Sequence, residues 1–327
     1  MNGRDHLRSV PKAMTKIFFA SDIHGSELCF KKFINAAQFY GVDVIILGGD
    51  LTAKMVIPLM EQGGKYHASL FGRTETAETQ EELKALEERI VANGFYLYRC
   101  DPDELGEILN SREKQFELFH RLILDSLKNW IGIAETRLAG SNIQCYIMAG
   151  NDDDPCVIEI LNQSRVIVNP EFKKVELPGG YEMISIGYSN ITPFESPRER
   201  EEDELYECLV EQANAIKDST TAIFNLHCPP HHSGLDTAPE LTSDLHIVLR
   251  GEQPSMVPVG STAVRRAIEE FQPLLGLHGH VHESRGAMKI GRTLCVNPGS
   301  EYAASVLRGV IVNLDGMKVK GYQFVSG

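Results

Sequence analysis

Residues Lys16–Gly25 have the sequence KIFFASDIHG, a short apolar run that ends in a turn carrying an aspartate and a histidine. A short apolar run bounded by turn residues is typical of a buried strand. Ser26–Tyr40 follows with apolar residues at helical spacing, and Val42–Leu47 is a second apolar run that leads into Gly49-Asp50. Strand, helix and strand predict a parallel pair with a right-handed crossover. Because ligands bind beyond the carboxyl ends of such strands, the residues of both turns are candidates for a site.

The same pattern recurs three times later in the chain. Apolar runs at 143–148, 221–226 and 274–277 each lead into asparagine or histidine residues. Carboxylate, amide and imidazole groups suit divalent ions such as Mn, Fe, Co, Ni or Zn. Two ions about 3.5–4 Å apart need one bridging group, and a carboxylate serves. The strand ends therefore predict a pair of divalent metal ions, with hydrolysis of a phosphate ester as the leading function. The candidate metal ligands are Asp22, His24, Asp50, Asn151, His227, His280 and His282.

The composition of the 327-residue chain narrows the classes of partner. The net charge is −13, and because an acidic protein is repelled by phosphate backbones, general nucleic-acid binding is not expected. A small phosphorylated substrate fits this charge if cations hold it, since bound cations are the largest local charges in a site. The sequence leaves homo-oligomerisation open.

The sequence favours the cytoplasm as the compartment. No stretch reaches the roughly 18 apolar residues that a membrane span needs, and residues 1–15 contain no apolar segment typical of a secretion signal. The seven cysteines are scattered and form no C-x-x-C pair. Reduced thiols are therefore expected.

The chain is predicted to form one domain over 1–327 with one large insertion. Residues 1–15 are polar and are expected to form a flexible segment. About a hundred residues separate Asp50 from Asn151, far more than one crossover needs. We therefore predict that 55–140 is an inserted, mainly helical subdomain that includes the crossover helix. The insertion begins soon after the strand that leads into Asp50, so it starts near the mouth of the expected site. It is therefore also the predicted specificity element.

Local patterns place further elements in and after this insertion. A capping box predicts a helix over Thr79–Asn93, Phe95–Tyr98 fits a strand, and apolar residues at helical spacing predict a longer helix around Phe116–Trp130. The apolar stripe of that longer helix suits core packing or, alternatively, the lining of a substrate pocket. Three late apolar runs are predicted to be antiparallel strands that close a sheet: Leu294–Val296, Gly309–Leu314 and Lys318–Val325.

Taken in order, the segments D-x-H, G-D, G-N, H and G-H-x-H resemble the calcineurin-like metallophosphoesterase family. The turn Asn297–Ser300 (NPGS) is similar to that of small bacterial and archaeal members. The resemblance covers about 16–325 and leaves 55–140 unmatched. It implies an α/β fold in which two mixed sheets pack face to face between layers of helices, a four-layer α-β-β-α sandwich.

The resemblance also implies a role for each ligand. The first metal would be held by Asp22, His24 and His282. The second would be held by Asn151, His227 and His280, and Asp50 would bridge the two ions. A hydroxide between the ions would attack phosphorus in line, while the ions stabilise the charge on the phosphoryl oxygens. Asn151 is expected to contact the substrate as well.

One position departs from the family pattern. In most members a histidine follows the asparagine, contacts the substrate phosphate and protonates the leaving group, whereas here the residue is Asp152. Carboxylates are ionised at neutral pH, and nearby cations favour that form further. As a catalytic residue Asp152 could not donate a proton and would repel an anionic substrate, which predicts a phosphodiesterase because a diester carries less negative charge than a monoester. Asp152 could instead orient His24 or His282, or cap a helix that begins near Asp154.

Other residues beside the ligand segments give weaker signals. His278 is a candidate catalytic residue and His231 a candidate substrate-binding residue, although a structural role is the favoured alternative for both and for His232. Arg265 and Arg266 follow Ser261, a plausible helix cap, and could hold an anion or be ordinary surface arginines. The charged run Arg198–Glu204 is predicted to be a solvated face.

The main alternative to an enzyme is a scaffold protein of the same fold, resembling the retromer subunit that binds partner proteins. That class tends to lose metal ligands, whereas all seven are intact here. A nuclease of the same superfamily is disfavoured by the acidic charge and by the lack of a basic, aromatic stripe.

Overall fold

The computed structural model describes residues 14–327, and two six-stranded sheets form its centre. The first sheet contains β1 (Thr15–Ala20), β2 (Val44–Leu47), β7 (Gln144–Ile147), β8 (Ile167–Val168), β21 (Arg308–Asp315) and β22 (Lys318–Ser326). The second contains β9 (Val175–Leu177), β10 (Tyr181–Ile186), β13 (Ala222–Leu226), β18 (Leu275–Leu277), β19 (Gly286–Ile290) and β20 (Thr293–Asn297). The strand orders are β22-β21-β1-β2-β7-β8 and β19-β20-β18-β13-β10-β9. Each sheet mixes parallel and antiparallel pairs.

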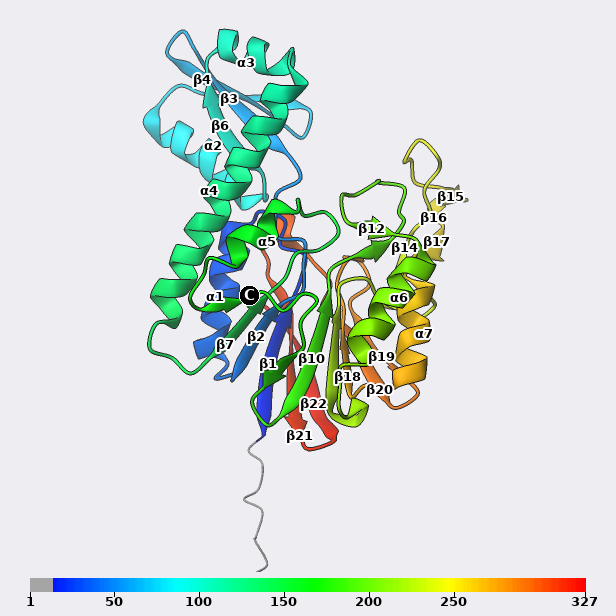
Figure 1. The fold of residues 1–327 in the computed structure, drawn as a ribbon. Helices are drawn as coiled ribbons and strands as arrows, with labels where there is room; N and C mark the ends of the chain where they lie inside the picture. Colours follow the sequence, from blue (N-terminus) through cyan, green and yellow to red (C-terminus); the bar gives the residue numbers. More distant parts are fainter. Residues whose placement is uncertain (1–13) are drawn as a thin grey trace, which may run out of the picture.

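Helices cover the outer face of each sheet (Figure 1). The first sheet is covered by α1 (Glu27–Phe39), α4 (Arg112–Leu138) and α5 (Cys156–Leu161), and the second by α6 (Glu202–Ala213) and α7 (Thr262–Phe271). Side chains alternate along β1, so Ile17 and Phe19 face the second sheet while Phe18 and Ala20 face the helices. The predicted four-layer α-β-β-α sandwich of two mixed sheets is therefore confirmed.

The helical layer over the first sheet is held by an apolar contact between α1 and α4. Ser26 caps α1 by accepting a hydrogen bond from the backbone N–H of Cys29. Phe30, on the buried stripe of α1, stacks on Trp130 of α4 with ring centroids 4.5 Å apart. Trp130 and Ile123 are buried in this layer. From Ile123 to Trp130 the apolar stripe of α4 thus serves core packing, the first of its two predicted roles, whereas Phe116 is exposed.

The inserted region carries a sheet of its own. β3 (Val56–Gln62), β4 (Lys65–Leu70), β5 (Arg73–Ala77) and β6 (Tyr96–Cys100) pair in the order β5-β4-β3-β6. α2 (Gln80–Ala92) packs on this sheet, and the predicted Thr79–Glu82 capping box begins the helix. α3 (Pro102–Leu109) follows, and the region stands beyond the carboxyl ends of β1 and β2 (Figure 1). Of the four strands, the sequence predicted only the last.

The late strands differ from the prediction that they are antiparallel neighbours in one sheet. β21 and β22 are antiparallel partners in the first sheet, but β20 lies in the second sheet, parallel to β18 and antiparallel to β19. Leu294 and Val296 of β20 pair in register with Leu275 and Leu277 of β18. That register places all four side chains in the core between the sheets, which explains the different assignment.

The predictions about the N-terminus, membrane spans and thiols meet different outcomes. Thr15, the last residue of the predicted flexible segment 1–15, is buried and begins β1, while 1–13 lie outside the described residues. Over 14–327, no helix has the length and apolarity to cross a membrane. All seven cysteines are free thiols, and five of them are buried.

Candidate metal centre

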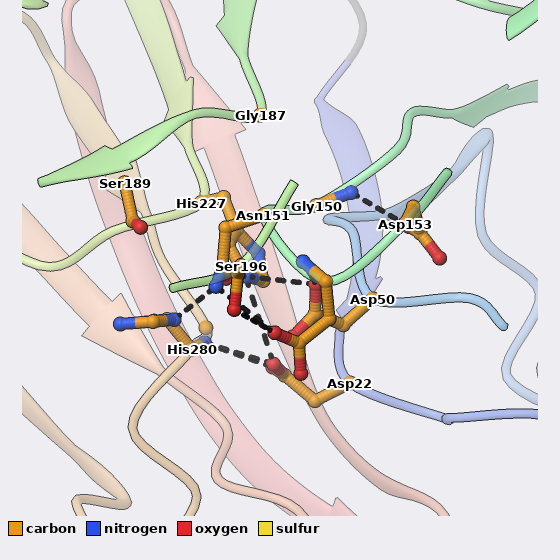
Figure 2. A network of polar contacts seen from close by, with 12 residues as sticks. Asp22, Asp50, Gly150, Asn151, Asp153, Gly187, Ser189, Ser196, His227 and His280 are labelled. Carbon is orange, nitrogen blue, oxygen red and sulfur yellow. Dashed lines mark hydrogen bonds and ion pairs between the residues drawn. The ribbon is translucent and has the colours of Figure 1, made fainter. Parts of the chain in front are cut away.

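The seven predicted ligands converge at one edge of the sandwich. They lie on the loops that follow β1, β2, β7, β13 and β18, so both sheets contribute. Figure 2 shows the side chains of Asp22, Asp50, Asn151, His227 and His280 pointing toward one another. The buried ligands are Asp22, His24, Asp50, Asn151 and His227, whereas His280 and His282 are half-buried and form the open side of the centre.

Asp22, His24 and His282 form the first ligand group. Their ligand atoms all lie within 4.8 Å of one another. The two Nε2 atoms of His24 and His282 are 3.1 Å apart, and His282 Nε2 lies 3.6 Å from Asp22 Oδ1. Two nitrogens about 2.1 Å from one ion would lie about 3.0 Å apart at a right angle and about 3.4 Å apart at a tetrahedral angle. The spacing therefore fits one divalent ion.

Asp50, Asn151, His227 and His280 form the second group. The amide oxygen of Asn151 lies 3.0 Å from His227 Nε2 and 2.8 Å from His280 Nδ1. Asp50 Oδ1 lies 3.4 Å from His227 Nε2, while Asp50 Oδ2 lies 3.6 Å from His24 Nε2 in the first group. Asp50 therefore presents one carboxylate oxygen to each group, as a bridging ligand must.

His227 shows how the backbone orients a ligand. Its Nδ1 lies 2.8 Å from the carbonyl oxygen of Gly48, so Nδ1–H donates to that oxygen. This leaves Nε2 as the ring atom that faces the other ligands, and its lone pair becomes available when a bound ion displaces the second ring proton. His227 Nε2 then faces two oxygen atoms, Asn151 Oδ1 and Asp50 Oδ1. Three electron-pair donors facing one another suit a bound cation.

The glycines that precede three of the ligands make room for other ligands. A Cβ on Gly49 would lie 2.6 Å from His227 Nδ1, and one on Gly150 would lie 2.1 Å from Asp50 Oδ1. A Cβ on Gly279 would lie 2.3 Å from Asp22 Oδ2. The G-D, G-N and G-H pairs of the sequence are thus a packing requirement of the centre itself.

Four of the ligands have a left-handed backbone, which non-glycine residues rarely adopt. The φ angles are 58° for Asp22, 34° for His24, 52° for Asp50 and 66° for His280. Such conformations persist where the surrounding structure enforces them, and they concentrate at functional sites. The fold therefore holds these side chains against their local backbone preference.

Burial and neighbouring charges set the protonation of the centre. Burial alone would raise the pKa of Asp22, but His282 and His227 outweigh it and lower that pKa to about 2. In Asp50, burial is likewise outweighed by His227 and His24, so its pKa lies well below the usual range. Burial opposes the charge of His227, yet Asp50 and Asp22 raise its pKa to about 9. Two buried carboxylates thus stay ionised and attract positive charge, which divalent ions would supply.

Comparison with known proteins agrees with this geometry. The family model described as calcineurin-like phosphoesterase matches residues 15–284. The chain belongs to this family. An uncharacterised protein of Methanocaldococcus jannaschii, MJ1162, is 34% identical over 158 residues, which are 48% of this chain and 64% of that protein. The match thus spans less than two thirds of the relative's length.

One solved structure shows a similar architecture. The crystal structure of TT1561 of Thermus thermophilus has a TM-score of 0.52 and 15% sequence identity, covering 96% of this chain and 99% of that chain. This likeness supports the fold. A structure described as a novel archaeal phosphodiesterase has a TM-score of 0.35 and 12% identity, covering 96% of this chain and 100% of that chain.

Asp153 joins two of the ligand loops of this phosphoesterase fold. The side chain is fully buried and accepts hydrogen bonds from the backbone N–H groups of Leu51, Thr52 and Gly150 at 2.7–3.0 Å. Burial and Asp50 raise the pKa of Asp153 to about 6. It therefore fixes the Asp50 loop against the loop that carries Asn151. An aspartate in a run of three gives no sequence signal for such a role.

Arg198 supports the same loop from the other side. It is 1% exposed, forms an ion pair with buried Glu171, and donates from Nη1 to the carbonyl oxygen of Gly150 at 2.8 Å. Its backbone N–H donates to the carbonyl oxygen of Asn151 at 3.1 Å. The prediction that the run Arg198–Glu204 is a solvated face is therefore wrong for Arg198, which has a buried carboxylate and two loop carbonyls as partners.

The Asn297–Ser300 turn ties the histidine loop to the Asp22 loop. Asn297 Nδ2 donates to the carbonyl oxygens of Gly279 and Val281 at 3.2 and 2.9 Å. Ser300 Oγ donates to the carbonyl oxygen of Asp22 at 2.6 Å. The turn thus positions the loops that carry ligands of both groups.

Asp152, at the position where most family members have histidine, is paired with a lysine. Its Oδ2 lies 2.6 Å from Lys54 Nζ, and its Oδ1 accepts from Ser196 Oγ at 2.5 Å and from Asn151 Nδ2 at 3.1 Å. A carboxylate oxygen of Asp152 lies within 4.8 Å of ligand atoms of His24 and Asp50. Lys54 gave no signal in the sequence because only the fold brings it to this carboxylate.

The two other roles considered for Asp152 do not match these contacts. Its hydrogen bonds go to Ser196 and Asn151, not to the ring N–H groups of His24 or His282. At the start of the next helix, α5, the backbone N–H of Cys156 donates a hydrogen bond to Asp154 Oδ1 at 2.8 Å. The carboxylate that bonds to the start of α5 is therefore that of Asp154, and not that of Asp152 as the helix-cap alternative had it.

His278 and His231 lie in different surroundings. His278 is fully buried and donates from Nδ1 to the carbonyl oxygens of Leu226 and Cys228, at 2.9 and 3.2 Å. Burial lowers the pKa of His278 to about 4, so the ring is neutral. This geometry favours a structural role for His278 over the catalytic one. His231, in contrast, lines the cavity beside the ligands, and its contact with substrate stays a prediction.

The start of α7 already holds a carboxylate. Glu202 accepts hydrogen bonds from Ser261 Oγ at 2.6 Å and from the backbone N–H groups of Thr262 and Ala263 at 3.0 and 2.8 Å. Arg265 pairs with Glu269 one turn along the helix. The anion considered from the sequence is therefore supplied by the chain itself.

A cavity of about 700 Å³ opens beside the ligands. Its lining comes from the ligand loops, residues 190–194 and residues 238–260, and includes none of the described residues of 55–140. The insertion instead packs behind His24, where a Cβ on Gly94 would lie 2.4 Å from the His24 carbonyl oxygen. The specificity element predicted at 55–140 thus supports a ligand, and the cavity wall comes from other loops.

Proposed function

We propose that this protein hydrolyses phosphodiesters with two divalent metal ions held by the seven ligands. The observation that carries the proposal is Asp50, which presents Oδ2 to His24 and Oδ1 to His227 at 3.6 and 3.4 Å. When bound, the ions would supply a water-derived nucleophile at neutral pH and offset charge on the phosphoryl oxygens. The family supports metal-dependent phosphoester hydrolysis, and the preference for diesters is our inference.

Lys54 is the positively charged side chain that the protein itself places in the cavity, beside any bound metal ions. It is the one lysine or arginine among the described residues that line the cavity. Burial opposes its charge, but Asp152 and Asp50 raise its pKa above the usual value, so it is a cation at neutral pH. We assign to Lys54 a contact with a non-bridging phosphoryl oxygen, with Asp152 holding the ammonium group in place.

The charge of the cavity supports a diester. Lys54 and Asp152 form a pair without net charge at the position where most members have histidine. Glu202, Glu240 and Glu283 also line the cavity. A phosphate monoester brings one more negative charge than a diester, so it meets more repulsion in this cavity. Because a carboxylate, Asp152, takes the place of the histidine that protonates the leaving group in most members, esters of acidic alcohols such as phenols should react best.

The test compares p-nitrophenyl phosphate with bis-p-nitrophenyl phosphate on purified, Mn²⁺-loaded protein. Both release the same alcohol, so the comparison holds the leaving group constant while the charge of the ester and its second substituent change. We expect a higher kcat/KM for the diester, and faster turnover of the monoester would contradict the proposal. Asp152→His frees Lys54 from its partner and removes a negative charge, so it should raise activity on the monoester.

The ligand atoms are oxygen and nitrogen, which suits Mn, Fe, Co, Ni or Zn. The substrate we propose is a small phosphoester, as the size of the cavity allows. The free thiols of all seven cysteines are in keeping with the cytoplasm as the place of action.

A further inference from the structure

One wall of the cavity is apolar and exposed. Ile191 and Phe194 line it from the loop between β11 (Ser189–Asn190) and β12 (Glu199–Arg200), and they are 52% and 63% exposed. Ile247, which lines it from a separate segment of the chain, is 51% exposed. Exposed apolar side chains that gather around a cavity mark a binding surface, whereas scattered ones do not.

Ile247 belongs to a long hairpin between β14 (Thr237–Pro239) and β17 (Met256–Pro258), with β15 (Leu249–Arg250) and β16 (Gln253–Pro254) at its tip. Figure 1 shows this hairpin standing beyond α6 and α7, on the side of the molecule where β12 lies. Leu241 and Val257 of the hairpin also line the cavity. The apolar wall therefore consists of two separate segments that face one cavity.

Backbone hydrogen bonds hold this wall in shape. Within the hairpin, Val248 N–H donates to the Glu240 carbonyl oxygen and Ser255 N–H donates to the Val248 carbonyl oxygen, both at 2.8 Å. In the other segment, Thr192 N–H donates to Glu199 Oε2 at 3.0 Å. A preformed apolar wall binds a ligand without first having to order a loop.

The wall is continuous with the metal centre. The same cavity is lined by Asp50, Asn151, His280 and His282, so a phosphoryl group at the ligands has its substituent beside the wall. A volume of about 700 Å³ is in the range of small-molecule sites. Apart from Lys54, the described lining residues offer no lysine or arginine to hold a second phosphate. The cavity therefore suits one phosphate and one apolar group.

We infer that the substrate is an ester of a single phosphate whose second substituent is apolar, aryl or alkyl, and packs against Ile191, Phe194 and Ile247. This inference rests on the proposed function and specifies the substrate class of the same site. It excludes polyphosphates and esters with strongly polar groups on both sides of phosphorus as preferred substrates.

The test uses two diesters with a common leaving group, methyl p-nitrophenyl phosphate and phenyl p-nitrophenyl phosphate. Each kcat/KM on Mn²⁺-loaded protein is divided by the rate constant of hydroxide with the same ester, which removes intrinsic reactivity. We expect the corrected phenyl-to-methyl ratio to be at least about 10, as for a small apolar group in an apolar pocket. Phe194→Ser should bring that ratio toward one.

Phe116→Ser is the matched control, because Phe116 is 64% exposed on α4 and Phe194 is 63% exposed. The control should keep the wild-type ratio. Hydrolysis of both esters with a corrected ratio near one would overturn the inference and leave the proposed function intact. Hydrolysis of neither ester would overturn both. A second copy of the chain covering the wall would also overturn it: Phe194→Ser would then change the sedimentation coefficient and not the ratio.

Discussion

Replacing Gly150 by alanine tests whether the glycine before a ligand is needed to seat the bridging carboxylate. A Cβ at this position would lie 2.1 Å from Asp50 Oδ1 and 2.3 Å from the backbone nitrogen of Asp50. Rotation of the Asp50 side chain cannot relieve the second overlap, because that atom belongs to the backbone. The two ligand loops must therefore move apart.

The size of that movement gives the expected effect. Ordinary contact begins near 3.4 Å, so the Asp50 loop must move by roughly 1 Å, whereas ligand distances tolerate only about 0.2 Å. Misplacing a reacting group by about 1 Å lowers the rate by about 10²-fold. We expect Gly150→Ala to lose at least one of the two ions and to lower kcat/KM on bis-p-nitrophenyl phosphate by about 10²-fold or more.

Two assays on the same preparation check this result. Metal content after dialysis is measured by inductively coupled plasma mass spectrometry, and hydrolysis is followed as released p-nitrophenolate. Gly132→Ala is the control, because a Cβ on Gly132 of α4 would meet nothing within 4 Å. A Gly150→Ala protein with full metal content and wild-type rate would refute the steric reasoning.

Two further substitutions probe charge and support. Lys54→Met should lower kcat/KM on the diester by about 10²-fold, as the loss of one charge-stabilising donor does. Lys65→Met is the control and should keep the wild-type kcat/KM, because the Lys65 side chain is also 49% exposed and also paired with a carboxylate. Equal rates for the two variants would contradict the assignment of Lys54. Arg198→Met leaves Glu171 buried without its partner, so urea unfolding should show a loss of about 3–5 kcal/mol. Arg89→Met, in an exposed pair, should lose about 1 kcal/mol or less, and a similar loss in both variants would argue against the buried pair.

The convergence of the seven candidate ligands could be predicted from the sequence because each follows a buried strand. Asp22, Asp50 and Asn151 stand directly beyond β1, β2 and β7, whose apolar runs are visible in the chain. Parallel strands bring such residues to one edge. The glycines before the ligands mark the same places, and the structure shows their steric reason.

The supporting residues could not be predicted in this way. Asp153, Arg198 and Lys54 act on backbone groups or side chains that are distant in sequence and adjacent only in the fold. Nothing in their local sequence separates them from solvated charges. The sequence of a charged run such as Arg198–Glu204 does not show which of its side chains is buried in the fold.

Three of the four strands of the insertion were not predicted, and one of them, β3, contains a residue that argues against a strand. Pro58 lies in β3, a central strand of its sheet, and proline is rare in central strands. The structure tolerates it because pairing between β3 and β4 begins at Leu59, so the absent N–H of Pro58 is not needed on that side. The prediction of late strands failed differently, since β20 and β21 are similar apolar runs that belong to different sheets.

The dinuclear centre is tested most directly by adding Mn²⁺ to metal-free protein and measuring bis-p-nitrophenyl phosphate hydrolysis as a function of equivalents added. Asp50 faces both ligand groups, so the function we propose would need two ions. We expect the rate to rise until two ions are bound per chain and then to level off. A protein that binds no divalent ion, or a rate that does not depend on the ion, would contradict the account.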